Sequence, residues 1–324
     1  MISTDPAVLT NLARSLQMQG RMEEAVAAFR RVAELRPDLA LAHVNLGVVL
    51  CEAGRLEESF ASFRRHAELE HGAAPPPAAE PAHKIRHDRE QREYLKAQGI
   101  AAAFHIETGG RIAGRAVQAK EGAAGRWQKN YPRIVVIDDF LTAAALDGLR
   151  RYCLGSTMWR EVYAGGYLGA MPQHGLGSPL LAQIAEELRD AYPAIFGTHP
   201  LRQFWAFKYD SRMSGIAVHA DAAVVNVNFW ITPDEANRDP ESGGLVIWDK
   251  AAPADWDFRT YNDDVTATRR FLKQVEAKPM RIPYRCNRAV IFDSGLFHET
   301  DRIDFKSGYL DRRINLTLLY GRRD

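Results

Sequence analysis

The sequence has no long run of apolar residues and few cysteines. No stretch of its 324 residues approaches the roughly 20 apolar residues that a helix needs to cross a bilayer. The N-terminus shows no basic start followed by an apolar segment and a small-residue cleavage site, so no secretory signal is indicated. Cys51, Cys153 and Cys286 are odd in number and far apart, which argues against a disulfide framework or a cysteine-bound zinc site. These absences favour a cytoplasmic protein with no membrane contact.

The sequence also has no excess of charge of either sign. Lys and Arg together number 42 and Asp and Glu 41, so the formal net charge is +1. Nucleic-acid-binding domains carry clustered positive charge, and this balance therefore predicts no nucleic-acid partner. The hydrophobic fraction of 46% and the charged fraction of 26% are typical of a globular protein. The length indicates about two domains.

Residues 6–71 contain an internal repeat with a period of 34 residues. Five of its seven marker positions keep their character in the second copy, the two sets being Leu12, Ala13, Leu16, Gly20, Ala25, Phe29 and Pro37, and Leu46, Gly47, Leu50, Gly54, Ser59, Phe63 and His71. This pattern resembles the tetratricopeptide repeat, which implies two helical hairpins within residues 1–71. Because such repeats normally stack in threes or more, we expect uncovered apolar ends and hence self-association or a protein partner.

Residues 72–130 are predicted to connect the repeats to the rest of the chain. The segment 72–82, GAAPPPAAEPA, is a Pro/Ala linker that is expected to be extended. Residues 84–99 predict a highly charged helix that caps the repeats or bridges to the next domain. His87 and Asp88 are adjacent, so on this helix they point in different directions, and we interpret them as solvated. Residues 100–130 are rich in Gly and Ala and give no specific prediction.

Residues 131–324 show many short strand patterns. Residues 133–142 predict a strand followed by a helix for which Thr142 is the N-cap, and 178–192 predict a second helix. Apolar runs between turn residues predict strands at 203–209, 215–220, 224–232, 244–249, 280–284, 288–293 and 312–320. This spacing indicates a β-sandwich or barrel.

One apolar stretch, GIAVHADAAVVNVNFW, carries two polar residues whose side chains are chemically reactive. His219 and Asp221 are two positions apart, so on a strand their side chains would point the same way. The simple alternative is a structural role, in which the histidine only forms a hydrogen bond to the neighbouring carboxylate. The pair is followed, however, by a Gly243-Gly244-Leu245 turn, by His298 just after a strand and by Arg313 on the last strand. Two histidines and one carboxylate form the facial ligand set that holds non-haem Fe(II) with open coordination positions.

Taken in order, these features resemble the Fe(II)- and 2-oxoglutarate-dependent dioxygenases, particularly the prolyl-hydroxylase-like branch. The resemblance covers residues 131–324 and implies a double-stranded β-helix of the jelly-roll or cupin type with flanking helices. The fold class expected for the whole chain is therefore α+β multidomain. The resemblance implies that His219, Asp221 and His298 bind Fe(II), that 2-oxoglutarate and O2 occupy its open positions, and that a substrate C–H bond is hydroxylated.

In such an enzyme a basic residue holds the far carboxylate of 2-oxoglutarate, and Arg313 is our prediction. The planar arginine fork donates two parallel hydrogen bonds to a carboxylate. Neighbouring residues of a strand face opposite ways, and Arg313 shares its face with the polar Asn315 and Thr317, whereas Arg312 shares its face with aliphatic residues. Arg312 therefore stays the weaker choice.

Three further residues are candidates for the cosubstrate pocket. Lys306 is an alternative to Arg313, because the 15 positions between His298 and Arg313 are more than the resemblance leads us to expect. Tyr209 is predicted to join the basic residue on the far carboxylate, and Asn228 to donate a hydrogen bond to the cosubstrate.

The sequence leaves the substrate and two other functions open. Because tetratricopeptide helices line grooves, a peptide or protein side chain is the first substrate class, with a polar small molecule as the other. Residues 250–279 are long enough to form a lid. The alternatives are a scaffold whose oxygenase domain is inactive, and a cupin dioxygenase that does not use 2-oxoglutarate. The second would show more histidine ligands and no inward arginine.

Overall fold

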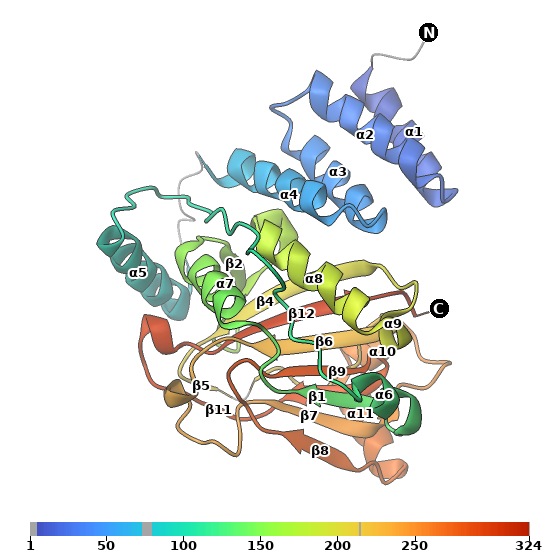
Figure 1. The fold of residues 1–324 in the computed structure, drawn as a ribbon, viewed down its shortest axis with the longest axis vertical. Coiled ribbons are helices and arrows are strands. Elements are labelled where there is room, and N and C mark those ends of the chain that lie inside the picture. The colour runs from blue at the N-terminus through green and yellow to red at the C-terminus, as the bar shows by residue number, and fades with distance from the viewer. Residues whose placement is uncertain (1–4, 73–79, 214, 324) are drawn as a thin grey trace.

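The computed structural model describes residues 5–72, 80–213 and 215–323. Most of the predicted linker 72–82 therefore lies outside the described residues. A helical layer formed by the N-terminal residues packs on a larger β-rich layer (Figure 1). Within the described residues, no helix is both long and apolar enough to cross a membrane.

The N-terminal layer consists of two helical hairpins, as the 34-residue repeat predicts. The helices are α1 (Pro6–Met18), α2 (Met22–Leu35), α3 (Ala40–Glu52) and α4 (Leu56–His71). Gly20 and Gly54 follow α1 and α3 with φ of 75° and 77°. Glycine adopts this left-handed conformation without steric strain and therefore commonly ends a helix. A Cβ at Gly47 would lie 2.9 Å from the Phe63 ring, so the close contact between α3 and α4 requires a residue without a side chain.

One end of the repeats is covered by the C-terminal part of the chain. The ring of Phe60 on α4 lies 4.8 Å from the ring of Phe204 in the β-rich layer, and Phe63 lies 6.4 Å from the same ring. These residues belong to one core that continues into the C-terminal part of the chain. At the other end, α1 leaves Val8 and Leu12 about half exposed.

The predicted charged helix is present as α5 (Ala82–Ala97), but the prediction of a solvated His87 is wrong. The His87 side chain is fully buried, with its ring 5.6 Å from that of Tyr309 and its Nδ1 2.9 Å from Asp88 Oδ1. The reason is tertiary, because α5 packs on the β-rich layer and turns His87 inward. The following residues run as extended chain over helices α7 (Ala143–Gly155) and α8 (Pro179–Ala191), where Gly109 O accepts from Leu180 N. They then form α6 (Ala123–Lys129).

The β-rich layer is built from antiparallel sheets. The largest has the order β1-β9-β6-β12-β4-β3-β2, with bounds Ile134–Ile137, Ala289–Asp293, Val225–Trp230, Ile314–Tyr320, Leu201–Tyr209, Tyr167–Ala170 and Trp159–Tyr163. A second sheet pairs β10 (Leu296–Thr300), β7 (Leu245–Ala251) and β8 (Pro279–Ile282), and a third pairs β11 (Ile303–Asp304) with β5 (Arg212–Met213).

The large sheet has a hydrophobic core on each face. Helices α7 (Ala143–Gly155) and α8 (Pro179–Ala191) cover one face, where Leu149 and Leu181 pack with Phe229 (Figure 1). The smaller sheets cover the other face, where Ile247 packs with Phe292. This arrangement of facing antiparallel sheets confirms the predicted fold class. The shorter elements are α9 (Pro193–Phe196), α10 (Phe258–Asn262), α11 (Val265–Gln274) and the 3-10 turns Pro172–His174, Asp234–Ala236 and Tyr309–Asp311.

Several predicted elements differ in detail from the structure. Residues 215–220 do not form a strand, and within them only His219 makes an isolated bridge, with His298. The last strand begins at Ile314 rather than at 312, and His298 lies within β10 rather than after a strand. Strands β2 and β3 were not predicted, because their residues show no clear alternation. Thr142 does cap α7, since its side chain accepts from Ala145 N.

Candidate metal centre and cosubstrate pocket

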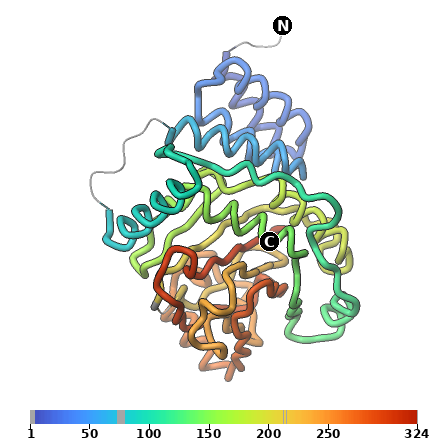
Figure 2. The backbone as a smooth tube through the Cα atoms, turned by 60° about the vertical axis from the view of Figure 1, so that its left-hand side comes forward, coloured from blue at the N-terminus to red at the C-terminus, as the bar shows by residue number. Residues whose placement is uncertain are grey.

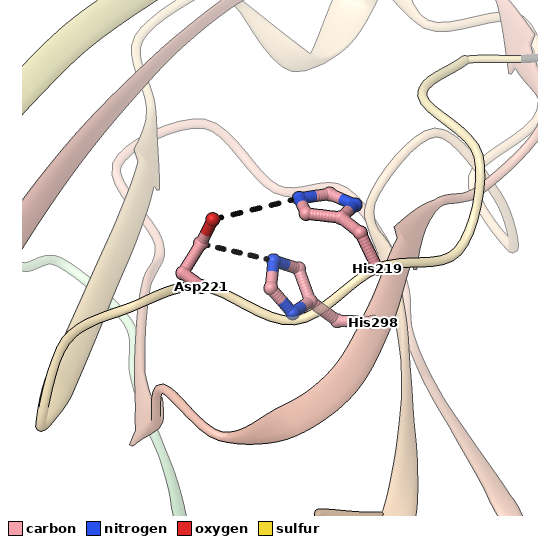
Figure 3. A group of neighbouring side chains, drawn as sticks. All are labelled: His219, Asp221 and His298. Atoms are coloured by element: carbon pink, nitrogen blue, oxygen red, sulfur yellow. Dashed lines mark ion pairs between the residues drawn. The ribbon is translucent and has the colours of Figure 1, made fainter. Parts of the chain in front are cut away.

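The structure brings His219, Asp221 and His298 together between the two larger sheets (Figure 3). One side-chain ligand atom from each residue lies within 4.8 Å of the others. His219 Nε2 is 3.8 Å from Asp221 Oδ1, and His298 Nε2 is 3.4 Å from Asp221 Oδ2. Among the described residues this is the one cluster of three or more such side chains that could hold a metal ion.

Backbone hydrogen bonds fix the positions of these three residues. His219 N donates to His298 O over 2.9 Å, and His298 N donates to His219 O over 2.8 Å, which places the two imidazole rings 4.4 Å apart. Asp221 N donates to Ser294 O in the turn before β10. A loop and a strand separated by about 80 residues in sequence are thus joined at the site. His219 is held in place by this bridge and not, as the sequence had predicted, by a strand of its own.

The hydrogen bonds of the imidazoles define their tautomers. Nδ1 of His219 lies 2.8 Å from Ala217 O, and Nδ1 of His298 lies 3.0 Å from Leu296 O. A carbonyl oxygen can only accept, so Nδ1 carries the hydrogen in both rings and Nε2 presents its lone pair. Both Nε2 atoms face Asp221. In metal sites the backbone carbonyls that accept from Nδ1 orient the ring in this way, so that Nε2 is free to bind the metal.

The protonation states also suit metal binding. Burial lowers the pKa of His219, and the nearby His298 lowers it further, so the neutral imidazole is favoured at neutral pH. For Asp221 burial by itself would raise the pKa, but the interactions with His298 and His219 outweigh it and keep the carboxyl pKa below its usual range. Neutral imidazoles and an ionised carboxylate are the forms that coordinate a metal.

A chain of buried amides continues from Asp221 along the inner face of the large sheet. Asn226 Nδ2 donates to Asp221 Oδ2 over 2.7 Å, and Asn228 Nδ2 donates to Asn226 Oδ1 over 2.6 Å. Asn228 Oδ1 in turn accepts from Asn315 Nδ2 and from Thr317 Oγ1. Asn226 orients the carboxylate directly, a role that sequence reasoning missed even though its position two residues before Asn228 placed it on the same face of the strand.

Arg313 lies fully buried at the end of this polar face. Its Nε donates to Gly243 O over 2.6 Å, and its guanidinium carbon lies 4.7 Å from the centre of the Tyr209 ring. Within the described part of the chain no carboxylate pairs with it, and its Nη1 has no hydrogen-bond acceptor. Burial lowers the pKa of this guanidinium, while Tyr209 opposes that shift. A buried cation with an unused donor is costly unless an anion joins it.

The two alternative basic residues are placed differently. Arg312 faces the opposite side of the strand, where its Nη2 lies 2.9 Å from Glu90 Oε2 and its Nη1 3.2 Å from Asp210 Oδ1. Its charge is therefore already neutralised. Lys306 is exposed to solvent. Of the three basic residues, Arg313 is the one that is both buried and without an acidic partner in the described structure.

A cavity of about 640 Å³ opens from the metal ligands. Tyr209, Asn228, Asn315 and Thr317 line it, so these sequence-predicted residues share one space with His219, Asp221 and His298. Arg313 does not line the cavity itself, but Tyr209 does and contacts it. Residues of the predicted lid, Phe258 and Asn262 of α10 with Asp263 and Val265, line the same cavity. Aromatic side chains form much of the remaining wall, namely Tyr163, Tyr167, Trp205 and Phe207.

Comparison with known proteins gives one result for the N-terminal helical hairpins and another for the β-rich part. Residues 10–77 match the family model described as tetratricopeptide repeat, which confirms the prediction for the N-terminal hairpins. No curated protein has a detectable match to the chain.

Several solved structures resemble the C-terminal part. The non-haem α-ketoglutarate-dependent epimerase SnoN from nogalamycin biosynthesis matches with 13% identity and a TM-score of 0.47 over 63% of this chain and 85% of that chain. A prolyl-4-hydroxylase from Pseudomonas putida matches with 15% identity and a TM-score of 0.39 over 62% and 100%. HygX from Streptomyces hygroscopicus, solved with nickel, 2-oxoglutarate and hygromycin B, matches with 12% identity and a TM-score of 0.41 over 63% and 87%. Similarity at this level does not assign a function, which has to be argued from the site.

Proposed function

We propose that this protein is an Fe(II)- and 2-oxoglutarate-dependent dioxygenase that hydroxylates a C–H bond of its substrate. The observation that carries the proposal is a combination: two Nε2 lone pairs and one carboxylate converge at one end of a polar face, and an unpaired buried arginine lies at the other end. The first group suits a divalent metal with open positions, and the second suits a carboxylate ligand.

In this proposal His219, Asp221 and His298 hold Fe(II), and Arg313 with Tyr209 binds the far carboxylate of 2-oxoglutarate. When bound, the metal and 2-oxoglutarate supply the oxidising chemistry with O2. The chain's own residues do the positioning: Asn226 holds the Asp221 carboxylate, Asn228 offers polar contacts to the cosubstrate, and the aromatic wall surrounds the substrate carbon with apolar surface. Excluding water in this way protects the site from unproductive oxidation.

The alternative functions are less well supported. An inactive scaffold is expected to have lost a ligand or the basic residue, whereas this chain has His219, Asp221, His298 and Arg313. A cupin dioxygenase without 2-oxoglutarate would use additional histidines, and the residues lining the cavity include no histidine besides His219 and His298.

The test is an anaerobic titration of Fe(II) into the metal-free protein with 2-oxoglutarate, followed by visible absorption. A charge-transfer band of the chelate is expected in the wild type. His219→Ala should abolish it, and Arg313→Ala should require far more 2-oxoglutarate, while Arg302→Ala, which changes an exposed arginine, should behave like wild type. Iron binding without a band would favour the cupin alternative, and no iron binding at all would favour the scaffold.

A further inference from the structure

The two edge strands of the large sheet add aromatic side chains to the metal cavity. Strands β3 and β2 lie beyond β4, at the edge of the sheet nearest the helical repeats (Figures 1 and 2). Tyr163 of β2 lies opposite Tyr167 of β3, which in turn lies opposite Tyr209 of β4, so the three side chains share one face of the sheet. All three line the cavity. The edge strands therefore extend the cavity wall with rings.

Four rings of this wall form a corner. The rings of Tyr163 and Tyr167 are stacked 4.4 Å apart at an angle of 5°. The Phe207 ring stands at 86° to the first and at 89° to the second, with centres 5.6 and 5.3 Å away. The Trp205 ring lies 6.3 Å from that of Phe207 at 49°. A group held among these four residues, the aromatic corner, contacts rings of different orientation at once.

Gly169 allows the rings to approach the sheet. It lies on β3 directly opposite Phe207. A Cβ at this position would lie 3.1 Å from the Tyr163 ring and 3.2 Å from the end of the Met171 side chain. Because glycine has no side chain, Tyr163 and Met171 can lie close to the backbone beside Phe207. The aromatic corner is thus built by the local sequence of β2, β3 and β4.

The charges around the cavity are one-sided. The described residues that line it include no lysine or arginine, whereas Asp221 and Asp263 carry carboxylates. Asp263 follows α10, is exposed and forms no ion pair within the described chain. In the proposed function the charges of Fe(II) and Arg313 are balanced by those of Asp221 and the 2-oxoglutarate dianion. The charge of Asp263 is then uncompensated, so the cavity repels an anionic substrate and attracts a cationic one.

We propose that the substrate of this site carries a methylated ammonium group, which the aromatic corner and Asp263 bind. The faces of aromatic rings attract cations, and the unpaired carboxylate adds to that attraction. Methylation matters because an ammonium with N–H groups would lose its hydrogen bonds to water against this wall, whereas methyl groups need no acceptor. The inference rests on the proposed function for the reaction, but binding of the cation needs neither metal nor cosubstrate.

The probes are choline and 3,3-dimethylbutan-1-ol, which have the same shape but differ in charge. Each gives one sharp methyl signal, so saturation-transfer NMR can follow the binding of both to the full-length protein. Choline is expected to bind at least tenfold more tightly to the metal-free protein. The preference should persist with Zn(II) and 2-oxoglutarate, since zinc supports no redox turnover. A preference lost on their addition would place choline at the metal ligands and overturn the inference.

Two substitutions test the rings and the carboxylate separately. Phe207→Leu removes a ring but keeps an apolar side chain, so affinity for choline should fall at least fivefold while affinity for the neutral probe changes less than twofold. Asp263→Asn should weaken choline binding by about threefold at low salt, and by less as salt is added. Asp255→Asn is the matched control, because Asp255 is exposed in the same segment but does not line the cavity, and it should match wild type.

The outcomes separate this inference from the proposed function. Equal affinity of the wild type for the two probes, or a parallel loss of both in Phe207→Leu, would overturn the cation site. If choline is preferred as expected but no chelate band forms in the iron titration, the oxygenase function fails and the cation site stands. If the band forms and choline is not preferred, the oxygenase function stands and the cation site fails.

Discussion

The guanidinium of Arg313 lies over the ring of Tyr209, with its central carbon 4.7 Å from the ring centre. The contact joins the residue before β12 to the end of β4 and places a fully buried cation beside a wall of the metal cavity. The Tyr209 hydroxyl is also buried, and burial raises the pKa of this phenol, so it stays neutral and able to donate. In the proposed function the two side chains together bind the far carboxylate of 2-oxoglutarate.

Arg313→Lys is expected to raise the concentration of 2-oxoglutarate that half-saturates the chelate band by at least tenfold. Lysine keeps the charge but loses the planar fork that binds a carboxylate through two hydrogen bonds. Fe(II) affinity measured without 2-oxoglutarate should stay unchanged, because Arg313 is not a metal ligand in our assignment. Equal 2-oxoglutarate affinity in both proteins would rule out Arg313 as the anion-binding residue.

Asn226→Ala is expected to lower Fe(II) affinity by roughly 10- to 100-fold, the usual effect of removing a residue that orients a metal ligand. Its amide donates to Asp221 Oδ2 over 2.7 Å, and without it the carboxylate loses a fixed orientation. Competition with a coloured chelator gives the affinity. Asn130→Ala, which changes an exposed asparagine after α6, is the control and should match wild type. An unaltered affinity in Asn226→Ala would show that the network has only a packing role.

Gly244→Ala is expected to weaken 2-oxoglutarate binding and to lower the unfolding temperature. A Cβ at Gly244 would lie 1.9 Å from Ile282 O, so the backbone of the turn before β7 must move. That turn supplies the Gly243 carbonyl that accepts from Arg313 Nε. Gly110→Ala is the control, because a Cβ there meets no atom within 4 Å. Calorimetry and the chelate titration report the two effects, and a stable variant with normal binding would contradict the assignment.

Glu90→Gln is expected to reduce the free energy of unfolding by roughly 1–3 kcal/mol, less than for a fully buried pair because Asp210 still faces Arg312. The pair fixes α5 to the start of β12, next to Arg313. Urea denaturation measures the change. Asp239→Asn removes a partner of the exposed Arg302 and should change the free energy of unfolding far less. A loss no larger than this control would mean that the α5 contact is held by packing alone.

Acidification is expected to weaken the contact between α4 and the turn after β3. His71 and His174 lie there with ring centres 5.7 Å apart, and burial, with Arg160 and the neighbouring imidazoles, lowers the pKa of each to about 4. The unfolded chain, with histidine pKa near ~6.5, then binds more protons between pH 6.5 and 4. The stabilisation is therefore complete above pH 6.5 and is lost as the pH falls through that range.

His174→Gln removes one of these two groups and should reduce the pH dependence. We expect the free energy of unfolding of the wild type to fall between pH 7 and pH 5 by about 1 kcal/mol more than that of the variant, after allowance for water reaching the partly buried rings. Urea midpoints at the two pH values provide the comparison. Parallel pH profiles for the two proteins would exclude this histidine as a source of acid sensitivity.

The sequence by itself determined the elements whose signals are local. The 34-residue repeat, the Thr142 cap, most of the strands and the pairing of Arg313 with the polar face of the last strand all follow from spacing along a few residues. The same is true of the choice of His219, Asp221 and His298, whose residue types and order point to one chemistry.

Tertiary structure decided what depends on contacts between distant segments. His219 is held by a backbone bridge to His298 rather than by a strand of its own, because the pairing partner lies 79 positions away. His87 is buried and Arg312 paired only because α5 packs against the β-rich layer. The repeats dock on the β-rich layer through Phe60 and Phe204, a contact across 144 positions that no local pattern encodes.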